Sequence, residues 1–217
     1  NDQGNHLFEN CVFEGGGHWY RCMLDASGGA QVTINHCEFR TGPEGGIRFG
    51  EGSGGDISDC ILEGLGGYGI TLLGSSPKIT RATFRQCGNA MRLESTAAGG
   101  GAFPVLSGCV FEGDDRIHIA GTILTSGTLM KAPYYLDGSS GVVPADVELT
   151  IAAGSTFHAA DWRSWTIHGN VIAEGTTSQP ILFSSASGAT EGNPWGAIRL
   201  TNDESTGESR PSRFAYC

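Results

Sequence analysis

The chain has 217 residues, and 13 lysine and arginine residues against 23 aspartate and glutamate residues give it a formal net charge of −10. This acidic balance argues against non-specific nucleic-acid binding, and no apolar run approaches the roughly 18 residues of a membrane-spanning helix. Glycine is abundant, at 35 residues, but it follows no strict triplet, which excludes a collagen-like chain.

A six-residue pattern recurs from the start of the chain. It reads apolar, two other residues, small, one other residue, apolar, and its small position returns every 22 to 27 residues. The five complete copies are Phe8–Phe13, Ile34–Phe39, Ile57–Leu62, Ile79–Phe84 and Leu106–Phe111. A repeat of this length is typical of a solenoid. We expect each copy to form a strand that pairs with the next copy, about 4.8 Å further along the axis.

The small position of this pattern is occupied by cysteine or alanine. The cysteines are Cys11, Cys37, Cys60 and Cys109, and Ala82 fills the remaining copy. Because free cysteine behaves as a small hydrophobe, the column predicts a packed stack of reduced thiols. One disulfide between adjacent turns stays open as an alternative, since stacked Cα atoms would lie within disulfide range. Zinc ligands with finger-like spacing are missing, so no metal site is predicted.

A column of charges follows the small column three residues later. Its members alternate in sign: Glu14, Arg40, Glu63, Arg85 and Glu112. If the copies stack as neighbouring strands, each charge lies between two opposite charges, which is a favourable cross-strand arrangement. We therefore expect a structural ladder of these five side chains on one outer face.

A second strand recurs within the same period. Its copies are Cys22–Leu24, Ile47–Phe49, Ile70–Leu72, Met91–Leu93 and Ile117–Ile119. The first and third residues are apolar, so the middle residue should point outward. These middle residues are Met23, Arg48, Thr71, Arg92 and His118, with Arg199 in a similar strand near the end of the chain. The pattern predicts a basic stripe, with Arg48, Arg92, His118 and Arg199 as ligand-binding residues whose guanidinium groups could bind carboxylates.

The second half of the chain keeps the strand character but loses the regular columns. Residues 1–121 hold the regular coils, 122–146 read as a looser joint, and 147–217 read as further coils that end in an incomplete copy at Cys217. Leu129, Leu149 and Val171 are spaced as one coil each. We expect glycine-rich corners, almost no helix, and a single all-β solenoid of about nine coils over residues 1–217.

The repeats resemble a known superfamily. The copies such as Ile34–Phe39 are similar to the repeats of right-handed parallel β-helix proteins of the pectate-lyase-like superfamily. The stretches Leu149–Phe157, Gly169–Gly175 and Pro180–Ser185 resemble the coils of bacterial secreted β-helix modules. The resemblance implies a right-handed helix and a secreted or cell-surface location. It does not fix a function, because this fold serves lyases, hydrolases, adhesins and phage spikes.

The densest polar cluster of the sequence offers weak catalytic candidates: Asp114, Asp115 and His118. Paired carboxylates near a histidine could carry out acid–base chemistry, as the paired aspartates of polygalacturonases do. The other motifs of those enzymes are missing, and two aspartates beside a glycine are typical of a solvated turn. The stretch Gly52–Ile57 partly matches a calcium-binding nonapeptide, so calcium stays open as an alternative to the absence of a cofactor.

These observations favour a structural or adhesive module of a secreted or cell-surface fibre over an enzyme. Residues suited to packing and pairing are abundant, whereas a complete catalytic set is missing. The expected partners are copies of itself or adjacent segments of a longer chain, stacked head to tail. An acidic polysaccharide is a further candidate partner, whereas neither nucleic acid nor a membrane span is expected. The alternatives are a carbohydrate-active lyase or hydrolase, or a glycan-binding module without turnover.

Overall fold

The computed structural model describes residues 5–17, 21–98, 100–113, 115–136, 142–160, 163–185, 196–201 and 211–217. Two compact units make up the chain, residues 1–117 and residues 118–217, and strand β15 (Ile117–Ala120) contains the division. Every regular element of the described residues is a strand, so these residues include no helix that could cross a membrane. The predicted all-β class is confirmed.

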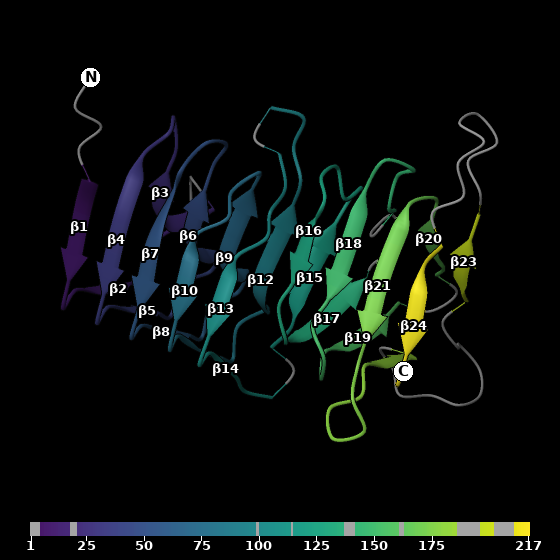
Figure 1. Cartoon of the computed structure of the whole chain (residues 1–217). Helices are drawn as coiled ribbons and strands as arrows, with labels where there is room; N and C mark the ends of the chain where they lie inside the picture. Colours follow the sequence, from purple (N-terminus) through teal and green to yellow (C-terminus); the bar gives the residue numbers. More distant parts are fainter. Residues whose placement is uncertain are drawn as a thin grey trace. The chain divides into compact units, whose positions relative to one another are not determined.

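The first unit is a solenoid in which each turn adds one strand to each of three sheets (Figure 1). The first sheet consists of β1 (Asn5–Glu9), β4 (Gln31–Asn35), β7 (Gly54–Ser58), β10 (Lys78–Thr80) and β13 (Val105–Ser107). The second sheet consists of β2 (Val12–Glu14), β5 (Glu38–Arg40), β8 (Ile61–Glu63), β11 (Thr83–Arg85) and β14 (Val110–Phe111). The third sheet contains β3 (Cys22–Ala26), β6 (Gly45–Phe49), β9 (Tyr68–Leu73) and β12 (Asn89–Glu94). These neighbouring strands pair in parallel, which confirms the predicted parallel β-solenoid.

The second unit repeats the parallel pairing with less regular turns. One sheet consists of β16 (Gly127–Leu129), β18 (Glu148–Ile151), β21 (Asn170–Glu174) and β24 (Arg213–Ala215). A second contains β17 (Pro133–Leu136), β19 (Thr156–Ala159) and β22 (Leu182–Ser185), and a third pairs β20 (Trp165–Ile167) with β23 (Ile198–Leu200). The segment expected to be a looser joint, 122–146, thus contains β16 and β17.

Turn length explains why the described strands form about seven turns rather than the nine expected. The expected number assumed a uniform repeat of 22 to 27 residues. In the second unit, however, the N–H of Val171 donates to the Ser212 hydroxyl across 41 residues of sequence, so one turn is much longer. The pairing of Leu129 with Leu149 that their spacing predicts is also wrong, because Leu129 pairs with Ile151, two residues further on.

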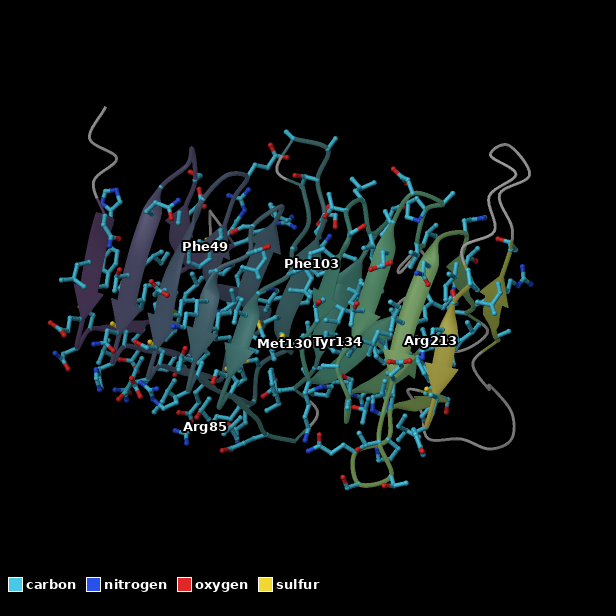
Figure 2. The ribbon with its side chains drawn as sticks, viewed as in Figure 1. Phe49, Arg85, Phe103, Met130, Tyr134 and Arg213 are labelled. Atoms are coloured by element: carbon cyan, nitrogen blue, oxygen red, sulfur yellow. The ribbon has the colours of Figure 1, made fainter. Side chains whose placement is uncertain are left out.

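Aromatic and branched side chains fill the interior in columns that follow the repeat. In the first unit the rings of Phe13 and Phe39 stack with centroids 4.5 Å apart, and those of Phe84 and Phe111 stack at 5.3 Å. In the second unit Tyr134, labelled in Figure 2, is buried and stacks on a phenylalanine ring at 5.0 Å. Each turn buries its apolar face only against its neighbours, so stability comes from stacking rather than from any single turn.

The corner between the first and second sheets is made by one residue in the left-handed backbone conformation. This residue stands directly before each small residue, and the five are Asn10, His36, Asp59, Arg81 and Gly108, with φ between 51° and 63°. A positive φ is uncommon for residues that carry a side chain. Only one of these five residues is glycine; the expected glycine corners lie elsewhere in the turn, as at Gly15 and Gly52, which also have a positive φ.

The thiols of Cys37 and Cys60 each approach two carbonyl oxygens, one in the same turn and one in the preceding turn. Sγ of Cys60 donates to the oxygen of Ser58, at 3.1 Å, and lies 3.7 Å from that of Ile34 in the preceding turn. Cys37 repeats the arrangement with the oxygens of Asn35 and Phe8 at 3.3 and 3.5 Å. All seven cysteines are free in the structure. Burial raises the pKa of the Cys60 thiol to about 11.

The charge column lies in register along the second sheet. Glu14 pairs with Arg40, Arg40 with Glu63, and Glu63 with Arg85. Glu112 follows β14, whose Phe111 pairs with the residue before Arg85. The guanidinium of Arg85, at the outer rim in Figure 2, bonds Glu63 at 2.7 Å. Arg40 instead bonds Glu38 of its own strand at 2.8 Å, so ion pairs join only some of the neighbouring charges of the column.

Candidate functional site

The third sheet of the first unit carries a row of polar side chains on its outer face. Register places Asp25, Arg48, Thr71 and Arg92 opposite one another on β3, β6, β9 and β12. The sequence pattern predicts Met23 as the first member of this row. That prediction is wrong, because Leu24, not Cys22, pairs with Ile47. The row therefore begins with a carboxylate rather than with a thioether.

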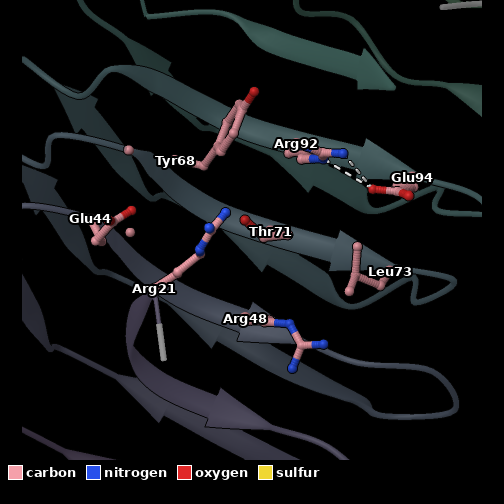
Figure 3. A pocket seen from close by; sticks show the side chains of 10 residues that line it. Arg21, Glu44, Arg48, Tyr68, Thr71, Leu73, Arg92 and Glu94 are labelled. Carbon is pink, nitrogen blue, oxygen red and sulfur yellow. Dashed lines mark hydrogen bonds and ion pairs between the residues drawn. The ribbon is translucent and has the colours of Figure 1, made fainter. Parts of the chain in front are cut away.

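A hollow of about 330 Å³ opens over this row. It is lined by Arg21, Glu44, Gly45, Arg48, Gly67, Tyr68, Thr71, Leu73, Arg92 and Glu94. Figure 3 shows Thr71 and Arg92 on neighbouring strands, with the Tyr68 ring beside Arg92 and Arg21 reaching in from the segment before β3. Arg48 and Arg92, both predicted from the sequence, thus share one groove. This hollow is called the groove from here on.

A glycine leaves the groove without a side chain at the start of β6. A Cβ added to Gly45 would lie 2.7 Å from the backbone oxygen of Tyr68 and 3.0 Å from that of Arg21. Real Cβ contacts are longer, so any side chain at this position would force the three turns apart. The backbone at the start of β6 is therefore bare, and space remains between Arg21 and Tyr68.

Both central arginines of the groove are already held by carboxylates. Nη1 of Arg48 donates to the two carboxylate oxygens of Asp25 at 2.9 and 3.1 Å. Nε and Nη2 of Arg92 donate to one oxygen of Glu94 at 3.1 and 2.7 Å. A guanidinium has five N–H donors. The bonds within the described residues leave Nε and Nη2 of Arg48, and Nη1 of Arg92, for an incoming acceptor.

Residues beyond the two predicted arginines complete the groove. The Arg92 guanidinium carbon lies 5.8 Å from the centroid of the Tyr68 ring, a cation–π contact that makes a planar wall. Arg21 is exposed and has a positive φ of 59°. Sequence reasoning missed Arg21, Tyr68 and Glu94. The glycine pairs at the start of β6 and directly before β9 were an available signal, since they stand beside Glu44 and Tyr68 and mark a close approach of turns.

One thiol of β3 lies next to this site. Burial and, to a smaller extent, the Asp25 carboxylate raise the pKa of the Cys22 thiol to about 11, against the opposing effect of the Arg48 guanidinium. A buried thiol with so high a pKa stays protonated at neutral pH and is a poor nucleophile. Cys22 therefore supports the sheet rather than adding chemistry to the groove.

In the predicted acidic cluster, the buried carboxylate binds a backbone N–H group. Asp115 is buried, and its carboxylate accepts the backbone N–H of Cys87 at 3.1 Å. Burial, with the Asp115 charge adding to it, raises the pKa of the Cys87 thiol to about 12. These residues line a second hollow of about 380 Å³, with Arg85 and Glu112 at the same corner. Asp114 lies outside the described residues.

The two remaining predicted ligand-binding residues belong to the second unit. His118 is only 9% exposed, rather than pointing into solvent, and its ring packs edge-on against Tyr135 with centroids 5.3 Å apart. Arg199 is exposed on β23 and pairs with Thr166. Its strand belongs to a two-stranded sheet, separate from that of β17, β19 and β22. Neither residue is part of the groove.

No group of three histidine, cysteine, aspartate or glutamate side chains within the described part of the chain is placed to hold a metal ion. The stretch compared with a calcium-binding nonapeptide instead forms the start of β7. The other acidic stretch of the sequence, residues 202–204, lies outside the described residues.

Comparison with known proteins agrees with the architecture. The model of the family described as right handed beta helix region matches residues 1–132, more than half of the chain. Neither the curated proteins nor the solved structures contain a match. The matched residues include every strand of the three sheets of the first unit and therefore the whole groove. By this match and by its parallel solenoid, the chain belongs to the family of right-handed β-helix proteins.

Proposed function

We propose that this chain is an adhesive β-helix module whose groove binds an acidic saccharide without cleaving it. The observation that carries the proposal is the groove itself, in which guanidinium donors and an aromatic ring converge from adjacent strands. Saccharide sites commonly combine a flat aromatic wall with planar polar side chains that bond hydroxyl and carboxylate oxygens. Such a ligand fits a protein that works outside a cell or at its surface.

The arrangement of charges supports an anionic ligand. Arg21 has no carboxylate partner in the described part of the chain, while Arg48 and Arg92 keep unused N–H donors. A carboxylate of the ligand could accept from these donors without displacing Asp25 or Glu94. Because arginine presents its donors in a fixed fork, it suits a planar carboxylate better than a lysine would.

The same pairs favour binding over catalysis. Asp25 and Glu94 each accept hydrogen bonds from an arginine of the groove, so lone pairs of both carboxylates are already engaged within the protein. Polysaccharide lyase or hydrolase activity is the alternative, and release of unsaturated or reducing sugars from an acidic polysaccharide would favour it.

The proposal is tested by titrating acidic oligosaccharides into the protein and measuring affinity by calorimetry. Arg92→Ala is expected to lower the affinity by about tenfold or more, the effect of losing a charged hydrogen bond. Tyr68→Ala is expected to lower it by about two- to tenfold, the effect of losing an aromatic contact. Arg85→Ala is the matched control, because Arg85 is also ion-paired but lies on the second sheet. Equal affinities for all four proteins would overturn the proposal.

Salt dependence gives a second readout. Three guanidinium groups of the groove, from Arg21, Arg48 and Arg92, lie among three carboxylates, so its net charge is close to zero. Affinity should fall with rising salt, because charge–charge attraction is screened, but less steeply than for a groove lined by unpaired cations. Affinity that does not change with salt would point to a neutral ligand.

A further inference from the structure

Two cysteines at the small position of the repeat lie side by side in the first two turns. Cys11 and Cys37 stand directly before Val12 and Glu38, which pair in parallel on β2 and β5. The N–H of Glu38 donates to the Cys11 oxygen at 2.9 Å, so the backbones beside the two thiols are joined. Neighbouring parallel strands lie about 4.8 Å apart, which falls within the Cα separation of about 4.4–6.8 Å that a disulfide bridges.

The Cys37 sulfur points toward the turn that carries Cys11. Its Sγ lies 3.5 Å from the Phe8 oxygen and accepts the backbone N–H of Cys11, also at 3.5 Å. Sγ of Cys11 donates to the Glu9 oxygen at 3.4 Å. Burial raises the pKa of the Cys37 thiol; the N–H of Cys11 opposes this, and the Cys11 side chain acts in the same direction as burial. The two side chains therefore interact directly, and a bond between their sulfur atoms would replace the S–H bonds to the Glu9 and Phe8 oxygens.

Exposure distinguishes this pair from the other neighbours of the column. Cys11 is half-buried, and β1 and β2 stand at the ends of their sheets, so a reagent can reach its thiol. Cys37 and Cys60, the next pair, are 0% and 1% exposed. Ala82 separates Cys60 from Cys109. Among the described residues of the column, Cys11 and Cys37 are therefore the adjacent pair that has an accessible member.

We propose that Cys11 and Cys37 form an oxidation site, at which a low-molecular-weight disulfide such as oxidised glutathione converts the two thiols into a bridge between adjacent turns. The Cys11 thiolate attacks one sulfur of the oxidant, which forms a mixed disulfide and releases the first glutathione. The Cys37 thiolate then attacks the Cys11 sulfur, which closes the bridge and releases the second glutathione. Each protein thiol loses one proton, each glutathione takes up one, and two electrons pass from the protein to the oxidant.

The bridge would hold a turn that has a neighbour on one side. In the described part of the chain, β1 pairs only with β4, and β2 only with β5. A covalent link across 26 residues of sequence restricts how far this turn can separate from the next one. Disulfides persist in oxidising compartments such as the space outside a cell, which is also where an adhesive module would work.

The test incubates the reduced full chain with oxidised glutathione, cleaves it at arginine without reduction, and identifies linked peptides by mass spectrometry. The expected product joins residues 1–21 to residues 22–40, with the mass of two hydrogen atoms missing. Cys37→Ala should abolish this link and leave Cys11 carrying one glutathione. A native chain in which Cys11 keeps its glutathione, or in which its thiol does not react, would overturn the proposal.

Two matched variants assign the partner of Cys11. Cys22 lies in the same peptide as Cys37, and Cys60 lies in the next turn of the column, so Cys22→Ala and Cys60→Ala should both keep the link. Alanine is suited to the column, because Ala82 occupies it with an exposure of 0%. Loss of the link in Cys22→Ala, or a link between Cys37 and Cys60 in the native chain, would overturn the proposal.

Hydrogen exchange measures what the bridge does to the first turn. The N–H groups of Asn10 and Glu38 bond across the two turns. Both should exchange about tenfold or more slowly in the bridged protein than in the reduced one, because the turns can no longer separate. Equal exchange rates in the two forms would contradict the stabilising effect of the bridge.

Discussion

The cysteine column makes a prediction that can be tested in both directions. Cys60 is 1% exposed, and Ala82 occupies the equivalent slot one turn later with an exposure of 0%. Cys60→Ala removes a buried sulfur atom and its S–H bond to the Ser58 oxygen. Ala82→Cys should add the same two contributions at the next turn, because the corner geometry is repeated there by Arg81.

The magnitude follows from the two contributions that the sulfur makes. Burying a group of this size contributes about 0.8 kcal/mol, and a weak neutral hydrogen bond adds about 0.5 kcal/mol. With a small cavity left behind, Cys60→Ala should lower the free energy of unfolding by about 1–2 kcal/mol. For a chain of this length, that corresponds to a fall in Tm of roughly 3–6 °C.

Thermal and urea unfolding of these two variants and of Cys60→Val provide the measurement. Ala82→Cys is expected to raise the stability by about 1 kcal/mol, and Cys60→Val to lower it by about 1–3 kcal/mol through overpacking. A neutral Cys60→Ala together with a destabilising Ala82→Cys would refute the idea of a slot that fits a thiol. It would leave Cys60 as a residue without energetic significance.

Three further results are expected. Gly55→Ala should lower the free energy of unfolding by at least about 3 kcal/mol, because its φ of 134° and a clash with the neighbouring turn exclude a side chain. Gly52→Ala should lower the free energy of unfolding by only about 1–2 kcal/mol, since its φ is positive but the space around it is open. Equal losses for the two variants in urea unfolding would contradict this. Between pH 9 and 11 the unfolded chain ionises the Cys60 thiol while the folded protein keeps it protonated, so stability falls as pH rises through this window, and Cys60→Ala should flatten the fall in a Tm–pH series. A thiol reagent should label the exposed Cys217 in the native protein well before Cys87, whose pKa burial raises to about 12, and the reverse order would be inconsistent with the structure.

The repeat predicted the sheets because one steric requirement recurs at each turn. A column that accepts only alanine or cysteine next to a column of large apolar residues requires stacked turns, and the register of the first and second sheets follows from it. The two register errors, at Met23 and at Leu129, have one physical origin. A slip of two residues keeps every side chain on its own face, so alternation alone cannot detect it.

The groove was less accessible to sequence reasoning. Arg48 and Arg92 stand out as charges within an apolar alternation, and the structure brings both to one hollow. Their carboxylate partners differ in kind: Asp25 comes from the preceding turn, whereas Glu94 comes from the same strand. Such choices depend on side-chain rotamers, which no repeat encodes. His118 was expected to point into solvent, but it is only 9% exposed and its ring packs against that of Tyr135.

The most direct test of saccharide binding is a crystal structure of the chain with an acidic oligosaccharide bound at saturating concentration. The predicted result is a saccharide in the groove, with a carboxylate bonded to at least one of Arg21, Arg48 and Arg92 and a sugar ring against Tyr68. A saccharide bound on another face of the first unit, or a groove that stays empty while calorimetry reports binding, would contradict it.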